Sequence, residues 1–252
     1  MKIVFDLDGT ICFSGKPLTR AMVQALDALA NHGYEIIFAS ARPIRDLLPV
    51  LPEHMHHYPM VGGNGAFAAA GGQLISLTPF DQATKEQLLQ LLLHFKADYL
   101  LDSSWDYAYT GDDEHPIRRN LDPHGKARNL PYSELTEIVK MVVLRCHDGD
   151  RMLSELQQLS VVTYVHGTED IMDISPQGVD KWSGLQALGL RPQEYIAFGN
   201  DANDISMFRH ASRSICVGEH AELKRIATHS VKSMEEQVIE KIFGLIPAKS
   251  KF

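Results

Sequence analysis

Apolar and polar positions along the first 78 residues alternate between two spacings. Short apolar runs that stop at polar residues or Gly predict buried strands over residues 3–5, 34–39 and 59–61. Apolar positions three or four apart predict a helix that Thr19 caps and Gly33 ends, and Pro43 suits the first turn of another. Because strands and helices alternate, we expect parallel sheet units rather than a sandwich.

The pattern changes at about residue 78. Thr78-Pro79 opens a leucine-rich helix that is predicted to reach about Phe95. Strand-like runs then follow at residues 99–101, 107–109, 141–146, 161–165 and 171–174, and residues 111–131 have the composition of a loop. This block predicts an α+β unit.

The parallel pattern returns after residue 178. A helix is expected from Asp180, followed by a strand at 195–198, a helix at 205–210 and a strand at 215–217. We therefore predict an α/β protein whose core consists of residues 1–78 and 179–252, with an inserted α+β domain over residues 79–178.

Composition narrows the possible partners. The chain is 44% apolar and 22% charged, which is ordinary for a soluble globular protein. The net charge of -8 and the lack of a basic stripe argue against nucleic acid and anionic lipid as partners. Three dispersed cysteines without a CxxC pair fit a reducing cytosol, and acidic residues at 6 and 8 interrupt any signal-peptide pattern. We expect a soluble, cytoplasmic protein; the sequence does not specify its oligomeric state.

Two carboxylates follow the first predicted strand, in Asp6-Leu7-Asp8-Gly9-Thr10. Carboxylates two residues apart at a strand end can point into one cleft, and sites in open parallel sheets form at the carboxyl ends of strands. One can act as a nucleophile and the other as a general acid and base, if their environments separate the roles. The alternative is an Asp-rich turn that only caps the strand.

Ser40 and Lys181 occupy comparable places. Ser40 follows a strand, where a hydroxyl and nearby N–H groups can hold a phosphoryl oxygen, although serine there is also common as a turn or cap. Lys181 lies near the start of a helix and can neutralise a phosphoryl group among carboxylates; its alternative is a solvated surface lysine.

The segment Gly199-Asn200-Asp201-Ala202-Asn203-Asp204 gathers two carboxylates and two amides directly after a predicted strand. Such hard oxygen ligands suit Mg²⁺, although the segment can also be a polar loop that caps a helix. If its carboxylates share a cleft with Asp6 and Asp8, each close pair costs about 4 kcal/mol at about 4 Å and an effective dielectric of about 20. An acidic site of this kind binds phosphate only with a metal ion.

Taken together, DLDGT, Ser40, Lys181 and GNDANDISM resemble, in order, the four motifs of the haloacid dehalogenase superfamily. The insertion between Ser40 and Lys181 looks like the cap domain of its Cof-like phosphatase branch. The resemblance implies a Rossmann-like parallel-sheet core with an inserted α+β cap domain. It also implies a magnesium-dependent phosphatase that hydrolyses a small phosphorylated metabolite, such as a sugar phosphate, through an aspartyl phosphate.

The resemblance assigns roles to particular residues. Asp6 would be the nucleophile and Asp8 the general acid and base. Ser40, Ala41, Lys181 and Asn203 would hold the phosphoryl group. Magnesium would bind to Asp6, to the backbone carbonyl of Asp8 and to the fourth motif.

Two departures leave part of this open. Many relatives have Gly-Asp where this chain has Gly199-Asn200, so Asn200, Asp201 or Asp204 can supply the remaining metal ligand. The second motif is Ser-Ala-Arg rather than the commoner Thr-Gly-Arg, but serine keeps the hydroxyl.

Polar and aromatic side chains of the inserted domain are candidates for substrate contacts: Tyr107, Tyr109, Arg118, Arg119 and His147. Two other functions use the same motifs. A phosphomutase would use the same aspartyl phosphate, and a non-catalytic regulatory module would bind phosphate or metal without turnover.

Overall fold

The computed structural model describes residues 1–13, 15–166 and 171–247. The larger sheet in this part of the chain contains β1 (Lys2–Phe5), β2 (Glu35–Ala39), β3 (Met60–Gly62), β4 (Phe67–Ala70), β5 (Gln73–Leu77), β11 (Tyr195–Gly199), β12 (Arg213–Val217) and β13 (His229–Val231). Their order is β13-β12-β11-β1-β2-β3-β4-β5. The pairs from β13 to β3 are parallel, and β4 and β5 add an antiparallel hairpin edge.

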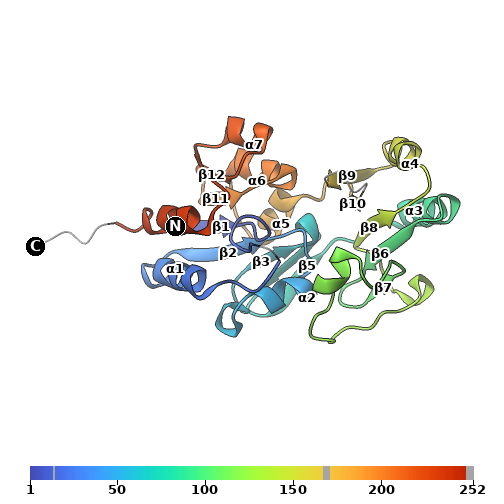
Figure 1. Cartoon of the computed structure of the whole chain (residues 1–252), viewed down its shortest axis with the longest axis horizontal. Helices are drawn as coiled ribbons and strands as arrows, with labels where there is room; N and C mark the ends of the chain where they lie inside the picture. The colour runs from blue at the N-terminus through green and yellow to red at the C-terminus, as the bar shows by residue number, and fades with distance from the viewer. Residues whose placement is uncertain (14, 167–170, 248–252) are drawn as a thin grey trace, which may run out of the picture.

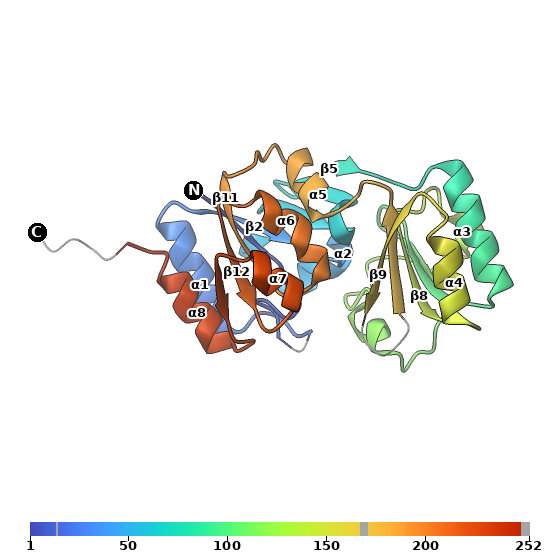
Figure 2. The same ribbon diagram turned by 90° about the horizontal axis from the view of Figure 1, so that it is seen from above.

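Helices cover both faces of this sheet (Figures 1 and 2). They are α1 (Arg20–Asn31), α2 (Ile44–Leu47), α5 (Lys181–Ala187), α6 (Ile205–His210), α7 (Ala221–Ile226) and α8 (Glu235–Phe243). Ile3 and Phe5 of β1 pack with residues of α1 and α8, whereas Val4 packs with residues of α5, α6 and α7. Because successive side chains of a strand point to opposite faces, a strand buried on both sides must be apolar throughout.

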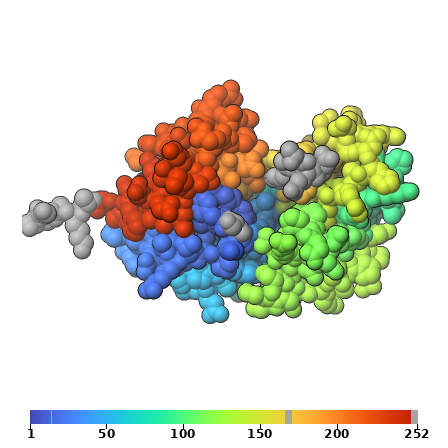
Figure 3. Space-filling view, viewed as in Figure 1, coloured from blue at the N-terminus to red at the C-terminus, as the bar shows by residue number. Residues whose placement is uncertain are grey.

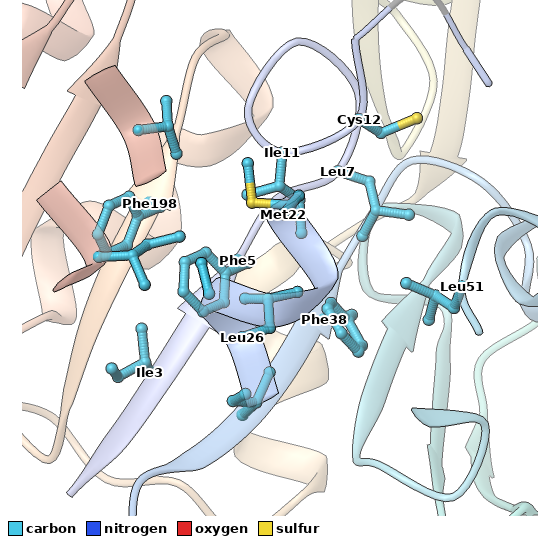
Figure 4. Packing of buried hydrophobic residues seen from close by; sticks show 14 of the residues in the cluster. Ile3, Phe5, Leu7, Ile11, Cys12, Met22, Leu26, Phe38, Leu51 and Phe198 are labelled. Carbon is cyan, nitrogen blue, oxygen red and sulfur yellow. The ribbon is translucent and has the colours of Figure 1, made fainter. Parts of the chain in front are cut away.

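The packing of the first face is shown in Figure 4. Phe5 and Phe198 lie side by side with ring centroids 4.8 Å apart, and Met22 and Leu26 of α1 lie over them. Leu7 and Ile11 belong to the same cluster, although they follow the strand. The loop that carries Asp6 and Asp8 is therefore anchored to the core on both sides of its acidic residues.

The second sheet is antiparallel and has the order β7-β6-β8-β10-β9. Its strands are β6 (Asp98–Asp102), β7 (Tyr107–Tyr109), β8 (Lys140–Arg145), β9 (Val161–His166) and β10 (Ile171–Pro176), and its helices are α3 (Gln82–His94) and α4 (Gly149–Leu156). Leu88, Leu92 and Met152 pack from these helices onto one face. The opposite face is left for the core and for the loop between β7 and β8.

These two sheets confirm the predicted α/β fold with a mostly parallel core and an inserted α+β domain. The space-filling view shows the inserted domain, in green and yellow, as a mass beside the blue-to-red core (Figure 3). The chain leaves the core after β5 and returns to it after β10. No helix in the described ranges is long and apolar enough to cross a membrane.

The predicted start of one helix was wrong. Thr78-Pro79 was expected to open it, but α3 begins at Gln82, because Asp81 accepts a hydrogen bond from the backbone N–H of Thr84 and caps the helix. The strands β4, β5 and β13 and the helices α4, α7 and α8 were not predicted. Two of these, β4 and β5, contain Ala, Gln and Ser, which give a weak strand signal.

Gly184 lets α5 approach the sheet closely. A Cβ at this position would lie 2.4 Å from Cγ1 of the buried Val61 and 2.9 Å from Cα of Gly65. Neither neighbour can move freely, because Val61 is a buried residue of β3 and Gly65 belongs to the buried turn that follows this strand.

Gly184→Ala should therefore destabilise the fold by about 1–3 kcal/mol, although Ala is the better helix former. Urea unfolding measures the change in the free energy of unfolding. Gly244→Ala is the matched control, since its Cβ would meet only ordinary contacts at 3.4 Å. If Gly184→Ala were as stable as the control, the close packing of α5 against β3 at this position would be contradicted.

Candidate active site

The carboxyl ends of three neighbouring strands bring three of the predicted motifs together. Phe5 at the end of β1 pairs with Phe38 of β2 and Phe198 of β11, so Asp6, Ser40 and Asn200 follow adjacent strands. The backbone N–H of Asp6 donates to the carbonyl of Phe198. Parallel pairing thus places residues from distant parts of the sequence at one edge of the sheet.

Lys181 lies between two of the predicted carboxylates. Its Nζ is 2.6 Å from Oδ1 of Asp6 and 2.6 Å from Oδ1 of Asp204. The side chain is fully buried, so the alternative of a solvated surface lysine is wrong. Asp180 fixes its position by capping α5 in a reciprocal capping box with Ser183.

Burial sets the ionisation of this cluster. Desolvation, and then the charge of Asp204, raise the pKa of Asp6 from 3.8 to about 7, although the Lys181 ammonium opposes this shift. Desolvation alone would lower the pKa of Lys181, but Asp204 and Asp6 raise it above its usual range. Lys181 therefore stays protonated. Asp6, the candidate nucleophile, is the group whose ionised form is disfavoured by burial.

Both oxygens of Asp204 are engaged within the protein. Oδ1 accepts from Lys181, and Oδ2 accepts from the backbone N–H groups of Asn200 and Asp201 at 2.7 and 3.0 Å. The residue is fully buried. Its contacts hold the loop after β11 against Lys181.

The side chain of Asn200 reaches toward the nucleophile candidate. The hydroxyl of Thr10 lies 2.8 Å from Oδ2 of Asp6 and 3.2 Å from Oδ1 of Asn200, which brings these two oxygens to one donor. Gly9, with φ of +80°, leaves the space: a Cβ there would lie 2.3 Å from the amide nitrogen of Asn200.

Asp201 has different surroundings. Its side chain is 45% exposed, its Oδ1 accepts from the backbone N–H of Ala202, and Nε2 of His220 is 3.8 Å away. It caps the short 3-10 turn Ala202–Asp204. Of the three candidate metal ligands in this motif, Asn200 is thus the one whose side-chain oxygen lies near the same donor, the Thr10 hydroxyl, as Asp6.

Asp8 forms a two-point ion pair with Arg42, whose Nε and Nη2 donate to the two carboxylate oxygens at 2.7 and 2.6 Å. The side chain of Asp8 remains 46% exposed. Ser40 is buried beside this pair, and its hydroxyl accepts from the backbone N–H of Arg42 at 3.1 Å. Arg42 therefore orients the second carboxylate of the first motif.

Asn203 begins a chain of hydrogen bonds that runs from the core into the inserted domain. Its amide donates to Oδ1 of Asn64, and the amide of Asn64 donates to Oδ2 of Asp173 on β10. Lys140 of β8 lies 2.8 Å from the same oxygen and donates to the carbonyl of Ala41 at 2.5 Å. Because a carboxylate only accepts, Asp173 fixes the direction of both amides in series.

A cavity of about 240 Å³ opens at Asp8, Ala41 and Arg42 and extends to the inserted domain. Its far wall includes Leu100, Val142 and Ile171. Ligand pockets in proteins span roughly 300–1,000 Å³, so this cavity suits a small ligand.

None of the five polar or aromatic residues expected to contact substrate is among the described residues that line this cavity. Arg118 lies over the ring of Tyr109 and pairs with Asp113, and Arg45 lies over the ring of Tyr107. The backbone N–H of His147 donates to Phe95, and Arg119 belongs to a 3-10 turn. The side chains of Tyr107, Tyr109 and Arg118 thus have local partners instead.

Sequence reasoning missed Arg42, Asn64, Lys140 and Asp173 as parts of the site. Arg42 belongs to the second motif, but its partner Asp8 is remote in sequence. The partners of Asn64, which are Asp173 and Asn203, are also remote in sequence. Lys140 and Asp173 interrupt apolar strand runs, and a charge on an otherwise buried strand is a signal that could have identified them.

The residues present fit a hard cation of the magnesium type. Within the described ranges, no three His, Cys, Asp or Glu side chains cluster as a metal site. Magnesium needs few carboxylates, however, because water and substrate oxygens complete its shell. Asp6 and the amide oxygen of Asn200, which both lie within hydrogen-bond distance of the Thr10 hydroxyl, provide two oxygen donors of this kind.

Comparisons with known proteins show what the whole chain is similar to. A model of haloacid dehalogenase-like hydrolases matches residues 3–243. The 5-amino-6-(5-phospho-D-ribitylamino)uracil phosphatase YitU of Bacillus subtilis is 24% identical over 93% of both chains. The HMP-PP phosphatase of Cronobacter sakazakii is 24% identical over 85% of this chain and 82% of its own.

The fold is also that of a solved structure. The subclass IIB sugar phosphatase BT4131 superimposes with a TM-score of 0.80 at 18% identity, over 97% of this chain and 99% of the other. The cap domain expected from the sequence is therefore part of a known architecture.

The raised pKa of Asp6 predicts how stability depends on pH. The folded chain holds this proton more tightly than the unfolded chain, so the contribution of Asp6 is complete below about pH 4 and is lost as pH rises through about 7. In the presence of a chelator, the wild type should lose stability relative to Asp6→Asn between these values. Urea unfolding at a series of pH values measures the difference, and a difference that stayed constant or grew with pH would contradict the assignment.

Proposed function

Because the chain belongs to the haloacid dehalogenase-like hydrolase family, we propose that it is a magnesium-dependent phosphatase whose Asp6 attacks the phosphorus of a small phosphorylated metabolite. The observation that carries this proposal is the pairing of Lys181 with the buried Asp6, on the same loop as Asp8, which lines a small cavity. The Cof-like resemblance and the enzyme class, a phosphoric monoester hydrolase, are confirmed. This class leaves no support for the non-catalytic alternative.

Small phosphorylated metabolites are the substrates for which two relatives are named, HMP-PP and 5-amino-6-(5-phospho-D-ribitylamino)uracil. The modest volume of the cavity supports the same size class here. We place residues 1–78 and 179–252 in the catalytic core and 79–178 in the cap; residues 248–252 lie outside the described range.

In the first step, a carboxylate oxygen of Asp6 attacks phosphorus, and the bond from phosphorus to the ester oxygen breaks. Asp8 donates a proton to the departing alkoxide, so the alcohol leaves neutral. The product on the enzyme is an aspartyl phosphate. The first step requires Asp8 to carry a proton, whereas the two-point contact with Arg42 holds its carboxylate form, which is the proton acceptor of the second step.

In the second step, Asp8 accepts a proton from water as the water oxygen attacks phosphorus. The bond to Asp6 breaks, and inorganic phosphate leaves with Asp6 regenerated. Lys181, the Ser40 hydroxyl, the backbone at Ala41 and the Asn203 amide hold the phosphoryl oxygens in both steps.

Magnesium would be held by Asp6, by the backbone carbonyl of Asp8 and by Asn200. It would supply the positive charge that lets an acidic site accept a phosphate dianion. We assign Asp204 and Asp201 to the support of this loop, because Asp204 uses both oxygens within the protein and Asp201 caps the following turn.

Asp6→Asn keeps the size of the side chain but removes the nucleophile. Turnover of p-nitrophenyl phosphate should fall by about 10³-fold or more, with circular dichroism unchanged. EDTA should stop the wild-type reaction, and added Mg²⁺ should restore it. Near wild-type activity in Asp6→Asn would contradict the mechanism. Release of one inorganic phosphate per substrate consumed, rather than an isomer, separates hydrolysis from a mutase.

The assignment of Asn200 predicts a contrast between neighbours. Asn200→Ala should raise the Mg²⁺ concentration for half-maximal activity by about tenfold or more, because a ligand is lost. Asp201→Ala is the matched control and should change that concentration little. Titration of activity with MgCl₂ gives both values, and a larger increase for Asp201→Ala would reverse the assignment.

A further inference from the structure

Three aliphatic side chains from three adjacent strands form the far wall of the cavity. Leu100 of β6 pairs in register with Val142 of β8, and Ile171 of β10 belongs to the same cluster. We call these three residues the aliphatic wall. It lies on the sheet face opposite α3 and α4, where Leu121 also packs.

The polar side chains on the same face are already bound to the core. These are Asp102, Lys140 and Asp173. Each lies two residues from a member of the wall on the same strand, and side chains two residues apart point to the same face of a sheet. Arg45 donates to Oδ1 of Asp102 at 2.7 Å, and Lys140 donates to the Ala41 carbonyl. These groups join the two domains, so the surface left for a ligand is mainly the wall.

The charge of the cavity disfavours a second anionic group on the substrate. Its lining contains Asp8, Asp46, Asp102 and Asp173. Its two cations, among the residues that the structure describes there, are Arg42 and Lys140, and each is paired with a carboxylate of the same cavity. A second phosphate or a carboxylate would meet acidic groups and engaged cations.

We propose that the aliphatic wall is the leaving-group subsite, and that the preferred substrates are phosphomonoesters of alcohols with an apolar ring and no second anionic group. This rests on the proposed phosphatase function and narrows its substrate class. The four carboxylates of the lining are already paired with Arg42, Arg45 and Lys140. Hydroxyls of a polyhydroxylated sugar that face the wall would therefore lack partners, and unpaired polar groups are costly to bury. An apolar ring gains from the same contact.

A matched pair of substrates tests the proposal. Cyclohexylmethyl phosphate and glucose 6-phosphate are both primary phosphate esters on a saturated six-membered ring, and they differ in the ring oxygen and the hydroxyls. The value of kcat/KM, measured by phosphate release with Mg²⁺, should be about tenfold or more higher for cyclohexylmethyl phosphate. Equal values, or a preference for glucose 6-phosphate, would overturn the proposal.

A variant localises the preference to the wall. Val142→Thr keeps the shape and adds a hydroxyl, so kcat/KM for cyclohexylmethyl phosphate should fall about fivefold or more. The value for methyl phosphate, which has no ring, should stay within about twofold. Val165→Thr, at an exposed position of β9 outside the cavity lining, is the matched control and should change neither. An equal loss on both substrates, or no loss, would refute the subsite.

The outcomes also distinguish failure of the subsite from failure of the proposed phosphatase function. If p-nitrophenyl phosphate, methyl phosphate and both ring esters all release no phosphate, the phosphatase function fails and the subsite fails with it. If phosphate is released with a preference for the sugar ester, only the substrate class is wrong.

Discussion

The contact of Lys181 with Asp6 and Asp204 is the interaction on which the rest of the site depends. The buried ammonium offsets the charge of two buried carboxylates, so removal of Lys181 would leave both of them uncompensated. The contact joins the end of β1, the start of α5 and the loop after β11. It therefore requires α5 to lie close to the sheet, which the missing side chain at Gly184 permits.

A second constraint couples the two domains. Asp173 of the cap accepts from Asn64, and this direction forces Asn64 to accept from Asn203. Lys140 compensates the charge of Asp173 and reaches the carbonyl of Ala41 in the second motif. The residues proposed to hold phosphate are thus oriented by a cap residue that need not touch the phosphate. Proximity and orientation of this kind contribute much of the rate in phosphoryl transfer.

Much of the fold follows from the sequence for a physical reason. Strands buried on both faces must be apolar, so β1, β2 and β11 were predicted to within a residue or two of their bounds, and their ends located Asp6, Ser40 and Asn200. The hairpin of β4 and β5 was missed because β4 is mostly alanine and β5 is largely exposed, and the exposed β13 gave no apolar run. Long-range contacts such as that of Arg42 with Asp8 have no local signature at all. The same limit explains why Arg118 and Arg119 were natural candidates for substrate contacts, while neither lines the cavity and its far wall is aliphatic.

The central claim is that Asp6 carries the phosphoryl group between the two steps. Asp8→Asn should slow hydrolysis of the intermediate more than its formation with an activated ester such as p-nitrophenyl phosphate, whose leaving group needs little help from an acid. Mass spectrometry of this variant, quenched in acid during turnover, measures the covalent adduct directly. The account predicts the mass of one phosphoryl group on the peptide that contains residue 6, and none when Asp6→Asn is added. Phosphate release without any adduct, or an adduct on another peptide, would contradict it.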